Sequence, residues 1–324
     1  MGRRSSPDWR EDAALSLLAD HVSELAECQT LVALDRRERL RAVLPDASFW
    51  HRHARAEIDA SAWPEPGLWP RIILRLPKAK AEQDMLIGCL ASRLKVDGSL
   101  LIAAANDEGA KSLPKRMKPL WAEVDTVALG KRCRVLRLSG PAQTEFDAND
   151  WQITHQILGR DWASWPGLFA AGRIDAGTAL LIDHLPDQLV ENARVLDFAC
   201  GTGILAAHLA HRHPTITPVC LDNDMLALTA TRLNLPQAVT KAADHANPAK
   251  LGKFELILSN PPFHTGKGED HAMLADLVQA IPHMLSPRGE ARLVVQSKLR
   301  LDKLSPKAVE LATAPGFTVW QIKG

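Results

Sequence analysis

The sequence contains no tyrosine, and no apolar stretch in it approaches the roughly 18 residues that a membrane-spanning helix needs. Its first residues are not followed by the apolar core of a signal peptide. These absences argue against a membrane-spanning helix and a secreted precursor, so we expect a globular protein of the cytoplasm. For the lack of tyrosine beside nine tryptophans we have no physical account.

Cysteine is also scarce, and its pattern excludes two classes of protein. The five cysteines are odd in number and widely spaced, and no two have the Cys-x-x-Cys spacing. This argues against both a disulfide framework and a zinc site, so we expect reduced thiols and no bound metal. The residues are Cys28, Cys89, Cys133, Cys200 and Cys220.

The sequence also has no low-complexity runs or short repeats, and its composition is that of a packed globular chain. With 324 residues, of which 46% are hydrophobic, the chain is long enough for about two domains. The formal net charge is only +1 at pH 7, so composition alone does not point to a strongly charged partner.

One polar turn organises the second half of the chain, at residues 259–264, where the sequence reads Ser-Asn-Pro-Pro-Phe-His. The apolar run 254–258 before it predicts a short buried strand. The two prolines have no backbone N–H, so the turn offers mainly acceptors, to which Asn260 adds an amide oxygen. Such a turn suits an amine, whose N–H bonds would be held on acceptors while Phe263 stacks on a heteroaromatic base. The pattern favours methylation of an amino group, although Asn and Pro are also ordinary strand-terminating residues.

A second turn lies upstream, where residues 194–203 read Arg-Val-Leu-Asp-Phe-Ala-Cys-Gly-Thr-Gly and residues 204–211 continue with helical spacing. A strand, a glycine turn and a helix begin a nucleotide-binding βα unit. Gly201 and Gly203 would let the backbone pass close to a ligand. Taken alone, a glycine turn of this kind has a high false-positive rate.

Two acidic residues follow the next predicted strands. Asp222 ends an apolar run, in the position from which a carboxylate accepts both ribose hydroxyls of a nucleoside. The alternative is helix capping, because Asp222, Asn223 or Asp224 would each cap the helix that follows. Asp244 comes after the strand predicted over 238–242 and is either an acceptor for an adenine amine or a solvated loop acid.

Together these residues resemble the class I S-adenosylmethionine-dependent methyltransferases, in the branch whose fourth strand ends in Asn-Pro-Pro-Phe/Tyr. The match narrows to the ribosomal-RNA guanine-N2 methyltransferases of the RsmC and RlmG type. It is carried by the Asn-Pro-Pro-Phe-His turn with Gly266 and by a segment before the first strand, and it continues weakly through the first half of the chain. That segment contains Phe169, Asp175, Gly177, Thr178, Leu180 and Leu181.

The resemblance implies transfer of a methyl group from S-adenosylmethionine to the N2 amine of a guanine in ribosomal RNA, in 16S rRNA rather than 23S rRNA. The implied catalytic residues are Asn260, Pro261 and Phe263. Cofactor binding is assigned to Asp197, Ala199, Gly201, Gly203, Asp222, Asp244 and Asn260, and substrate binding to Phe263, His264, Phe169 and Thr178. The partner is ribosomal RNA, in a ribosomal subunit or an assembly intermediate, and we expect a monomer. The target guanine has to be unpaired or flipped out.

The expected fold is α/β, with two tandem Rossmann-like methyltransferase domains. Residues 1–140 form a degenerate domain that supports RNA binding, residues 141–165 a linker and lead-in, and residues 166–324 the domain with the cofactor site. The first domain has neither a glycine turn nor an Asn-Pro-Pro sequence, and it opens with an amphipathic helix predicted over residues 8–29. The last strand is predicted over 317–322, so we expect the terminal antiparallel hairpin of the family to lack its final strand.

A near-neutral chain is an unusual RNA-binding protein, because phosphate contacts require a basic surface. Local clusters in the first domain would have to supply it, although each also fits a solvated face. The clusters are Arg36, Arg37, Arg39 and Arg41 in one predicted helical stretch, Arg52 and Arg55, Lys111, Lys115, Arg116 and Lys118, and Lys131, Arg132 and Arg134.

Two other functions remain open. A protein methyltransferase that acts on a glutamine amide would use the same acceptor turn, although Phe263 stands where such enzymes usually have tyrosine. A binding protein that has kept the fold and lost turnover is the second alternative, because a fold does not by itself establish an activity.

Overall fold

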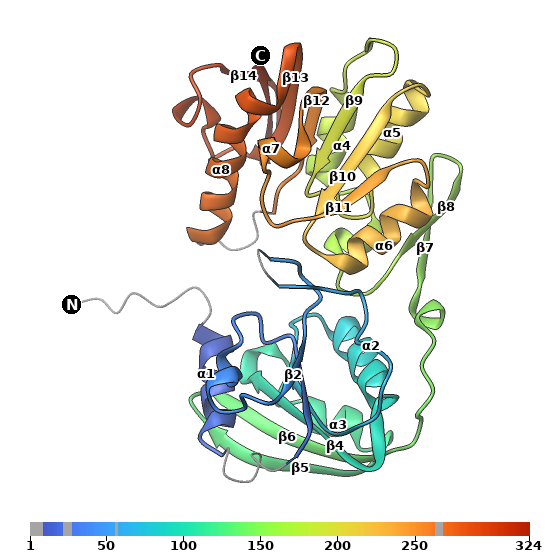
Figure 1. Ribbon diagram of the computed structural model, residues 1–324, viewed down its shortest axis with the longest axis vertical. Helices are drawn as coiled ribbons and strands as arrows, with labels where there is room; N and C mark the ends of the chain where they lie inside the picture. The colour runs from blue at the N-terminus through green and yellow to red at the C-terminus, as the bar shows by residue number, and fades with distance from the viewer. Residues whose placement is uncertain (1–8, 22–27, 56–57, 263–267) are drawn as a thin grey trace, which may run out of the picture. The chain divides into compact units, whose positions relative to one another are not determined.

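The computed structural model describes residues 9–21, 28–55, 58–262 and 268–324, and the chain divides into two compact units (Figure 1). The first unit contains Met1–Arg52 and Asp59–Gln152. The second contains Ile153–Gly324 together with the short segment His53–Ile58. Each unit is built around its own sheet, with helices on both faces.

The first unit has a six-stranded sheet of order β2-β1-β3-β4-β6-β5, in which β6 runs antiparallel to both of its neighbours, β4 and β5, and the other pairings are parallel. The helices α1 and η2 cover one face, and α2 and α3 cover the other. The strands are β1 (Thr30–Ala33), β2 (Ser48–Trp50), β3 (Trp69–Arg75), β4 (Leu94–Ala105), β5 (Trp121–Gly130) and β6 (Cys133–Pro141). The helices are α1 (Trp9–Ala19), α2 (Lys80–Ala91) and α3 (Leu113–Met117), with the 3-10 helices η2 (Arg39–Ala42), η3 (Asn106–Glu108) and η4 (Ala148–Trp151).

The second unit has a seven-stranded sheet of order β11-β10-β9-β12-β13-β15-β14, again with an antiparallel pair at one end, and a separate hairpin of β7 and β8. The strands are β7 (Ile153–Ile157), β8 (Arg160–Ser164), β9 (Arg194–Phe198), β10 (Thr217–Asp222), β11 (Val239–Ala242), β12 (Phe254–Ser259), β13 (Leu285–Gln296), β14 (Ala308–Ala314) and β15 (Phe317–Lys323). The helices are α4 (Ala176–Asp183), α5 (Ile204–Arg212), α6 (Met225–Asn234), α7 (Pro248–Leu251) and α8 (Gly268–Met284), with η5 (Phe169–Gly172) and η6 (Leu301–Lys303).

The helices of the second unit pack on opposite faces of its sheet (Figure 1). Apolar residues of α4, α5 and α6 share one core with the hairpin, whereas those of α7 and α8 share the other. The central strands β9 and β12 are buried on both sides, which explains why most of their residues are apolar. Both expected Rossmann-like sheets are thus present.

The carboxyl ends of β9, β10 and β12 meet at one edge of this sheet, because the three strands are parallel neighbours. Phe198 of β9 pairs with Leu221 of β10 and with Ser259 of β12. From β9 the chain proceeds to β10 and β11 on one side and returns with β12 on the other. Such a reversal of strand order is where open α/β sheets bind their ligands.

The structure corrects two sequence predictions in the first unit. The helix expected over residues 8–29 ends at Ala19. The prediction ran too far because the stretch has no glycine or proline that would mark the end of a helix. The arginines at 36–41 do not share a helix either, because only Arg39–Ala42 forms a turn of 3-10 helix.

The prediction of a missing terminal strand is also wrong. β14 pairs antiparallel with β15, and β15 lies between β14 and β13, so the hairpin is complete. The alanine-rich β14 escaped sequence analysis because it is an edge strand whose exposed residues, including Val309 and Leu311, blur the alternation of apolar and polar positions. Among the residues described, no helix is both long and apolar enough to cross a bilayer.

Candidate functional site

The turn between β9 and α5 adopts backbone conformations that favour glycine. Ala199, Gly201 and Gly203 have φ values of 57°, 56° and 84°. A Cβ built on Gly201 meets nothing within 4 Å, whereas one on Gly203 would lie 3.1 Å from Cγ2 of Thr231 on α6. Gly203 therefore allows the turn to pack on α6, and Gly201 leaves its own side of the turn open to a ligand.

Asp222, the last residue of β10, holds this turn in place. Its Oδ2 accepts a hydrogen bond from Gly201 N at 2.8 Å, and its Oδ1 accepts one from Asp224 N at 2.9 Å. Each oxygen keeps a second lone pair for a ligand hydroxyl. The N-cap of α6 is Asp224, whose Oδ1 accepts from Leu226 N at 2.9 Å. Of the three capping candidates in the sequence, the structure selects Asp224.

A second carboxylate, Asp197, is fully buried on β9 beside the same turn. Its Oδ2 accepts from Ala206 N at 3.1 Å, and its buried Oδ1 has no hydrogen-bond partner among the residues that the structure describes. Burial raises the pKa of Asp197 to about 7. Burial, followed by the charge of Asp224, raises the pKa of Asp222 to about 6. A ligand that donates hydrogen bonds or carries positive charge would stabilise both carboxylates.

The loop after β10 also pairs with a segment from much earlier in the chain. Ala54 N donates to Asn223 O at 2.7 Å, and His53 forms an antiparallel bridge with Asp224. His53 Nε2 lies 3.8 Å from Asp224 Oδ2. Residues 53–54 therefore hold the loop that follows Asp222, and no pattern in the sequence signals this pairing.

The Asn-Pro-Pro turn lies directly beside the glycine turn. Ser259 at the end of β12 is fully buried, and its Oγ donates to Phe198 O at 2.8 Å. Asn260 follows and is half-buried, with its Nδ2 2.9 Å from Thr178 Oγ1 and 3.3 Å from Asp175 Oδ2. The structure thus brings the two motifs, and the start of α4, to one edge of the sheet.

The other predicted site residues are less closely tied to this edge. Phe169, on η5, is 44% exposed. Asp244 follows β11 and forms a 2.6 Å contact with Nδ1 of its neighbour His245. Phe263 and His264 lie outside the described residues, so their predicted contact with substrate stays a prediction.

Sequence analysis missed two residues whose side chains donate hydrogen bonds to Thr202 of the glycine turn. Trp162 of β8 is fully buried, and its Nε1 donates to Thr202 Oγ1 at 3.1 Å. Asn234, at the end of α6, donates from Nδ2 to Thr202 O at 3.1 Å and to Ala163 O at 2.9 Å. The sequence has three tryptophans close together, Trp151, Trp162 and Trp165, but this grouping does not reveal a partner that lies 40 residues further along.

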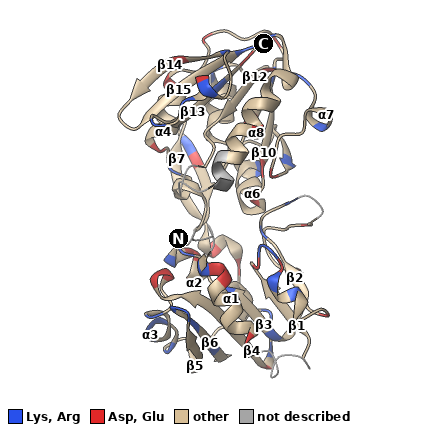
Figure 2. Ribbon diagram, turned by 90° about the vertical axis from the view of Figure 1, so that its left-hand side faces the viewer, with Lys and Arg blue, Asp and Glu red and all other residues tan. Residues whose placement is uncertain are grey.

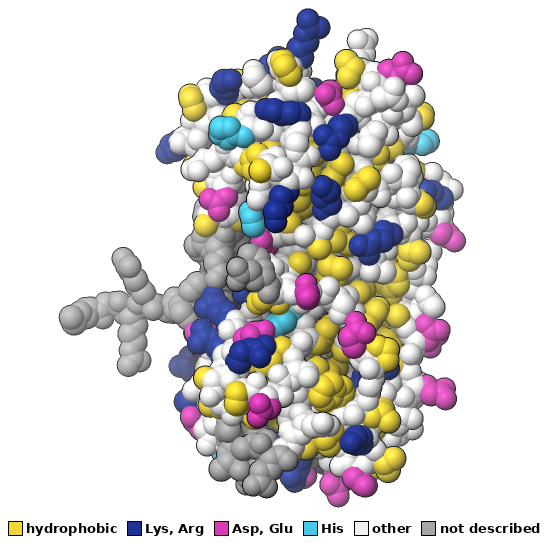
Figure 3. Space-filling view, in the orientation of Figure 1, with side chains coloured by type: hydrophobic (Ala, Val, Ile, Leu, Met, Phe, Trp, Pro, Cys, Tyr) yellow, Lys and Arg dark blue, Asp and Glu magenta, His cyan; other side chains and the backbone are white. Residues whose placement is uncertain are grey.

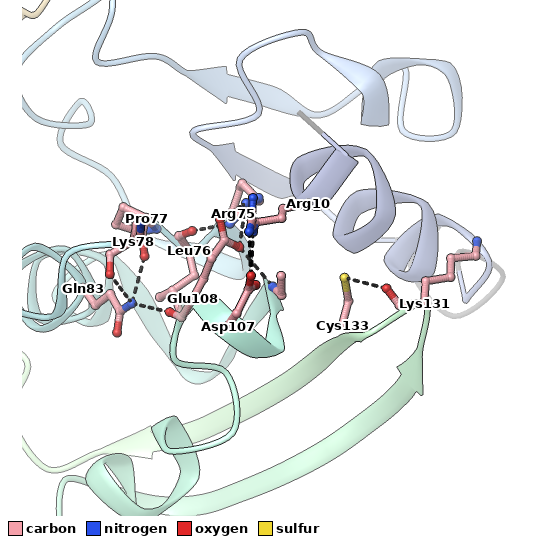
Figure 4. Close-up of polar contacts among 11 residues, drawn as sticks. Arg10, Arg75, Leu76, Pro77, Lys78, Gln83, Asp107, Glu108, Lys131 and Cys133 are labelled. Atoms are coloured by element: carbon pink, nitrogen blue, oxygen red, sulfur yellow. Dashed lines mark hydrogen bonds and ion pairs between the residues drawn. The ribbon is translucent and has the colours of Figure 1, made fainter. Parts of the chain in front are cut away.

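In the first unit, the carboxyl edge of the parallel strands carries a different set of side chains (Figure 4). β3 lies between β1 and β4 as β12 lies between β9 and β13, so Leu76 takes the place of Asn260. Arg75 donates to both oxygens of Glu108, at 2.8 and 2.9 Å. Gln83 Nε2 donates to Pro77 O and to Glu108 O, both at 2.8 Å. This edge therefore presents an internal network of ion pairs and hydrogen bonds, with no side-chain amide at the end of β3.

Two family models match the chain. The model "Methyltransferase small domain" matches residues 161–320, and "Methyltransferase small domain N-terminal" matches residues 36–155. Ribosomal RNA small subunit methyltransferase C of Pseudoalteromonas atlantica is 32% identical over 76% of this chain and 75% of its own length. The protein of the same name from Pseudomonas syringae pv. syringae is 31% identical over 86% of this chain and 90% of its own length.

Among solved structures, the fold matches the T. thermophilus 16S rRNA guanine-N2 methyltransferase RsmC in complex with AdoMet and guanosine. The TM-score is 0.76 at 20% identity, and the match covers 94% of this chain and 91% of that one. The likeness extends over both units, which agrees with the two expected tandem methyltransferase domains. By its sequence similarity along most of its length, the chain belongs to the ribosomal RNA small subunit methyltransferase C family.

Proposed function

We propose that this chain transfers a methyl group from S-adenosylmethionine to the exocyclic N2 amine of a guanine in 16S ribosomal RNA. The observation that carries the proposal is the position of the Asn260 amide beside the glycine turn, with its Nδ2 engaged by Thr178 and Asp175. Its family membership and the names of its relatives agree with this reaction.

The residues around the glycine turn fit S-adenosylmethionine, which when bound supplies an electrophilic methyl group. The open side of Gly201 admits a ligand close to the backbone, and Asp222 has an acceptor position on each oxygen for the ribose hydroxyls. The Oδ1 of Asp197, which has no hydrogen-bond partner in the described part of the chain, would accept from a donating or cationic group of the cofactor. Asp244, beyond β11, is the candidate acceptor for the adenine amine.

The Asn-Pro-Pro turn orients the substrate. The Asn260 Oδ1 and the Pro261 carbonyl accept the two N–H bonds of the amine, so the nitrogen lone pair faces the methyl group. The nitrogen would form its bond to the methyl carbon as the carbon–sulfur bond breaks and S-adenosylhomocysteine leaves. The methylated nitrogen would then be acidic and would lose one proton to solvent without a strong general base. Phe263 and His264 follow this turn in the sequence, where an aromatic ring would stack on the flipped-out base.

RNA binding falls in part to the first unit, and ion pairs reduce the number of candidate cations. Arg52 is 2% exposed and pairs with Glu82 at 2.8 Å, so it is unsuited to phosphate contact. Arg116 donates to Gln83 at 2.9 Å and pairs with Asp84, and Lys131 pairs with Asp20 at 2.8 Å. The exposed lysines on and beside α3 are better placed, and Figure 2 shows basic residues in this region. They are Lys111, Lys115 and Lys118.

The distribution of charge agrees with a local RNA contact rather than a broad one. Figure 3 shows cationic side chains spread over the visible face, with acidic and neutral ones between them. With a net charge of +1, long-range attraction to RNA is weak, so recognition would depend on a few phosphate contacts and on the fit of the target base. The partner that we propose is a ribosomal subunit or an assembly intermediate in the cytoplasm.

The test is a methyl-transfer assay with the purified full-length chain and S-adenosylmethionine labelled with tritium in its methyl group. The acceptors are small subunits, naked 16S rRNA, large subunits and a peptide release factor, each from a strain that lacks the corresponding modification. Label should enter 16S rRNA, and mass spectrometry of the digested nucleosides should identify N2-methylguanosine.

Each other outcome rejects the proposal in a different way. Label in the release factor would favour the glutamine-amide reaction. Label in 23S rRNA would contradict the assignment to the small subunit. An absence of label from every acceptor, with cofactor binding measured by calorimetry, would favour a binding protein that keeps the fold without turnover.

A further inference from the structure

Asn260 belongs to a cluster of three polar side chains, and the other two, Asp175 and Thr178, have no part in the catalytic assignment. Asp175 is the N-cap of α4, and its Oδ1 accepts from Gly177 N at 2.9 Å and from Thr178 N at 3.3 Å. Its Oδ2 accepts from Thr178 Oγ1 at 2.5 Å and from Asn260 Nδ2 at 3.3 Å. The hydroxyl oxygen of Thr178 also accepts from Asn260 Nδ2, at 2.9 Å.

The chemistry of this cluster fixes which end of the Asn260 amide faces it. A carboxylate can only accept hydrogen bonds, and the Thr178 hydroxyl has already given its proton to Asp175. Both partners therefore offer lone pairs to Asn260, and only the NH₂ end of the amide can satisfy them. Because the amide is planar, its Oδ1 must point away from Asp175 and Thr178.

We infer that Asp175 and Thr178 are positioning residues that hold Asn260 with its oxygen toward the substrate. This inference rests on the proposed function. When the Asn260 oxygen faces the substrate, the site accepts N–H bonds and so selects an amine. If the amide were reversed, its NH₂ group would face the NH₂ group of the substrate, and two donors cannot form a hydrogen bond. Thr178 thus acts through Asn260, whereas the sequence resemblance assigned it to substrate binding.

The burial of the cluster supports this role. Thr178 is 6% exposed and Asp175 and Asn260 are half-buried, so water does not readily replace either partner of the amide. Asp175 is itself fixed by two backbone N–H groups at the start of α4. The Asn260 amide is therefore held by a side chain that is itself fixed to the start of a helix, and this limits rotation of the amide.

The test compares substitutions that keep the shape of the cluster and change only its hydrogen bonding. Asp175→Asn keeps the helix cap, because Asn caps as well as Asp, but turns an N–H donor toward Asn260. Thr178→Val removes the hydroxyl, and Thr178→Ser retains it. Asp183→Asn, at the exposed end of the same helix, is the matched control.

For Asp175→Asn we expect kcat to fall on the order of 10²-fold, with the KM for S-adenosylmethionine within about threefold of wild type. Thr178→Val should also lower kcat, by about tenfold or more, whereas Thr178→Ser and Asp183→Asn should stay within about threefold. Wild-type turnover in both Asp175→Asn and Thr178→Val would overturn the inference. So would equal losses in Thr178→Ser and Thr178→Val, because then packing and not the hydroxyl would matter.

A second readout is independent of methyl transfer. In protein labelled with ¹⁵N in asparagine, the side-chain NH₂ signal of Asn260 is identified by its absence from Asn260→Asp. Its protons should exchange slowly with solvent in wild type and in Thr178→Ser, and faster in Asp175→Asn and Thr178→Val. Equal exchange in all four proteins would overturn the inference. If the wild-type chain did not methylate guanine, the proposed function would fail while this measurement still decided the orientation of the amide.

Discussion

At the scale of single residues, the site depends on which atoms of two polar side chains are already engaged. Asn260 has its NH₂ group bound within the protein and its oxygen available, whereas both oxygens of Asp222 accept from the backbone and keep room for one further donor each. Residue identity alone does not give this information. In the proposed site, Asn260 and Asp222 would act as acceptors for ligands because of the partners that the fold brings to them.

Asn260→Ala should remove most methyl transfer and leave the cofactor site intact. The alanine cannot accept from the amine, so we expect kcat to fall on the order of 10²-fold or more, with cofactor affinity within about threefold of wild type. Single-turnover rates and calorimetry measure the two effects separately. Turnover at the wild-type rate would show that the turn only ends a strand.

Asn260→Asp provides a sharper comparison at the same position. The aspartate keeps an acceptor oxygen, but its carboxylate would face that of Asp175, to which Asn260 Nδ2 now donates at 3.3 Å. Like charges at such a separation repel, so this variant should be both less active than wild type and less stable. A thermal melt that matched wild type would contradict the placement of Asp175.

The buried carboxylates predict a pH dependence of cofactor binding. If Asp222 binds the ribose as we propose, its ionised form accepts the hydroxyls best, and its pKa is raised to about 6 from 3.8, chiefly by burial. Affinity should therefore fall by about tenfold between pH 7 and pH 5, since protonation competes with binding. Calorimetry at several pH values measures this change, and Asp222→Asn should show weaker binding that is nearly independent of pH.

The stability of the cofactor-free protein should change in the opposite sense. The folded-state pKa values of Asp197 and Asp222, about 7 and about 6, lie above the ordinary value of 3.8, so the folded state binds more protons between these limits. The contribution of these groups is fully present below about pH 4 and is lost as the pH rises through 6 and 7. Melting curves of Asp197→Asn should lose this part of the pH dependence.

At the scale of elements, the glycine turn is held between β10, α6 and the hairpin of β7 and β8. Asp222 binds Gly201 N, Thr231 Oγ1 donates to Gly201 O at 2.9 Å, and Trp162 binds Thr202. A turn fixed by three separate elements keeps its shape before a ligand arrives. This pre-organisation lowers the entropic cost of binding.

Two glycine substitutions should separate ligand access from stability. Gly201→Val should abolish cofactor binding, because its side chain enters the open space beside the turn and a β-branched residue is strained at a φ of 56°. Gly203→Ala should instead destabilise the fold by about 1–3 kcal/mol, since its Cβ meets Thr231 at 3.1 Å. Thermal denaturation and calorimetry on both variants test the division, which an unchanged affinity in Gly201→Val would refute.

At the scale of the whole molecule, two sheets of the same design carry different groups at their carboxyl edges. The second unit has the glycine turn and Asn260 there, whereas the first has Leu76 and the Arg75–Glu108 pair. We propose that methyl transfer is confined to the second unit and that the first contributes to RNA binding.

Replacement of Lys111, Lys115 and Lys118 by glutamine should weaken RNA binding and leave cofactor affinity unchanged. If all three contact phosphates, the slope of log K against log salt concentration should become less negative by about 2, at roughly 0.7 per contact with single-stranded RNA. Filter binding at several salt concentrations measures the slope. The matched control replaces Lys250, Lys253 and Lys323, exposed lysines near the opposite end of the strands in the second sheet. An equal effect of both triple variants would contradict a specific role for the α3 region.

The sequence by itself determined the reaction class and most of the second unit. Its motifs are local, because a glycine turn and an Asn-Pro-Pro turn are each specified by the backbone demands of a few consecutive residues. The helix α5 and the strands β12 and β15 each differ from their predicted ranges by one residue. Buried central strands can be predicted in a similar way, because mainly apolar runs mark them without reference to their neighbours.

Only the tertiary structure decided which partners these residues have. The link from Asp175 to Asn260 spans 85 positions, that from Trp162 to Thr202 spans 40, and Ala54 reaches Asn223 from the first third of the chain. The edge strand β14 and the capping role of Asp224 were likewise settled by packing and hydrogen bonding. Such contacts form because strands that are distant in sequence end at one edge of a sheet. That adjacency depends on the order of the strands, which no local pattern records.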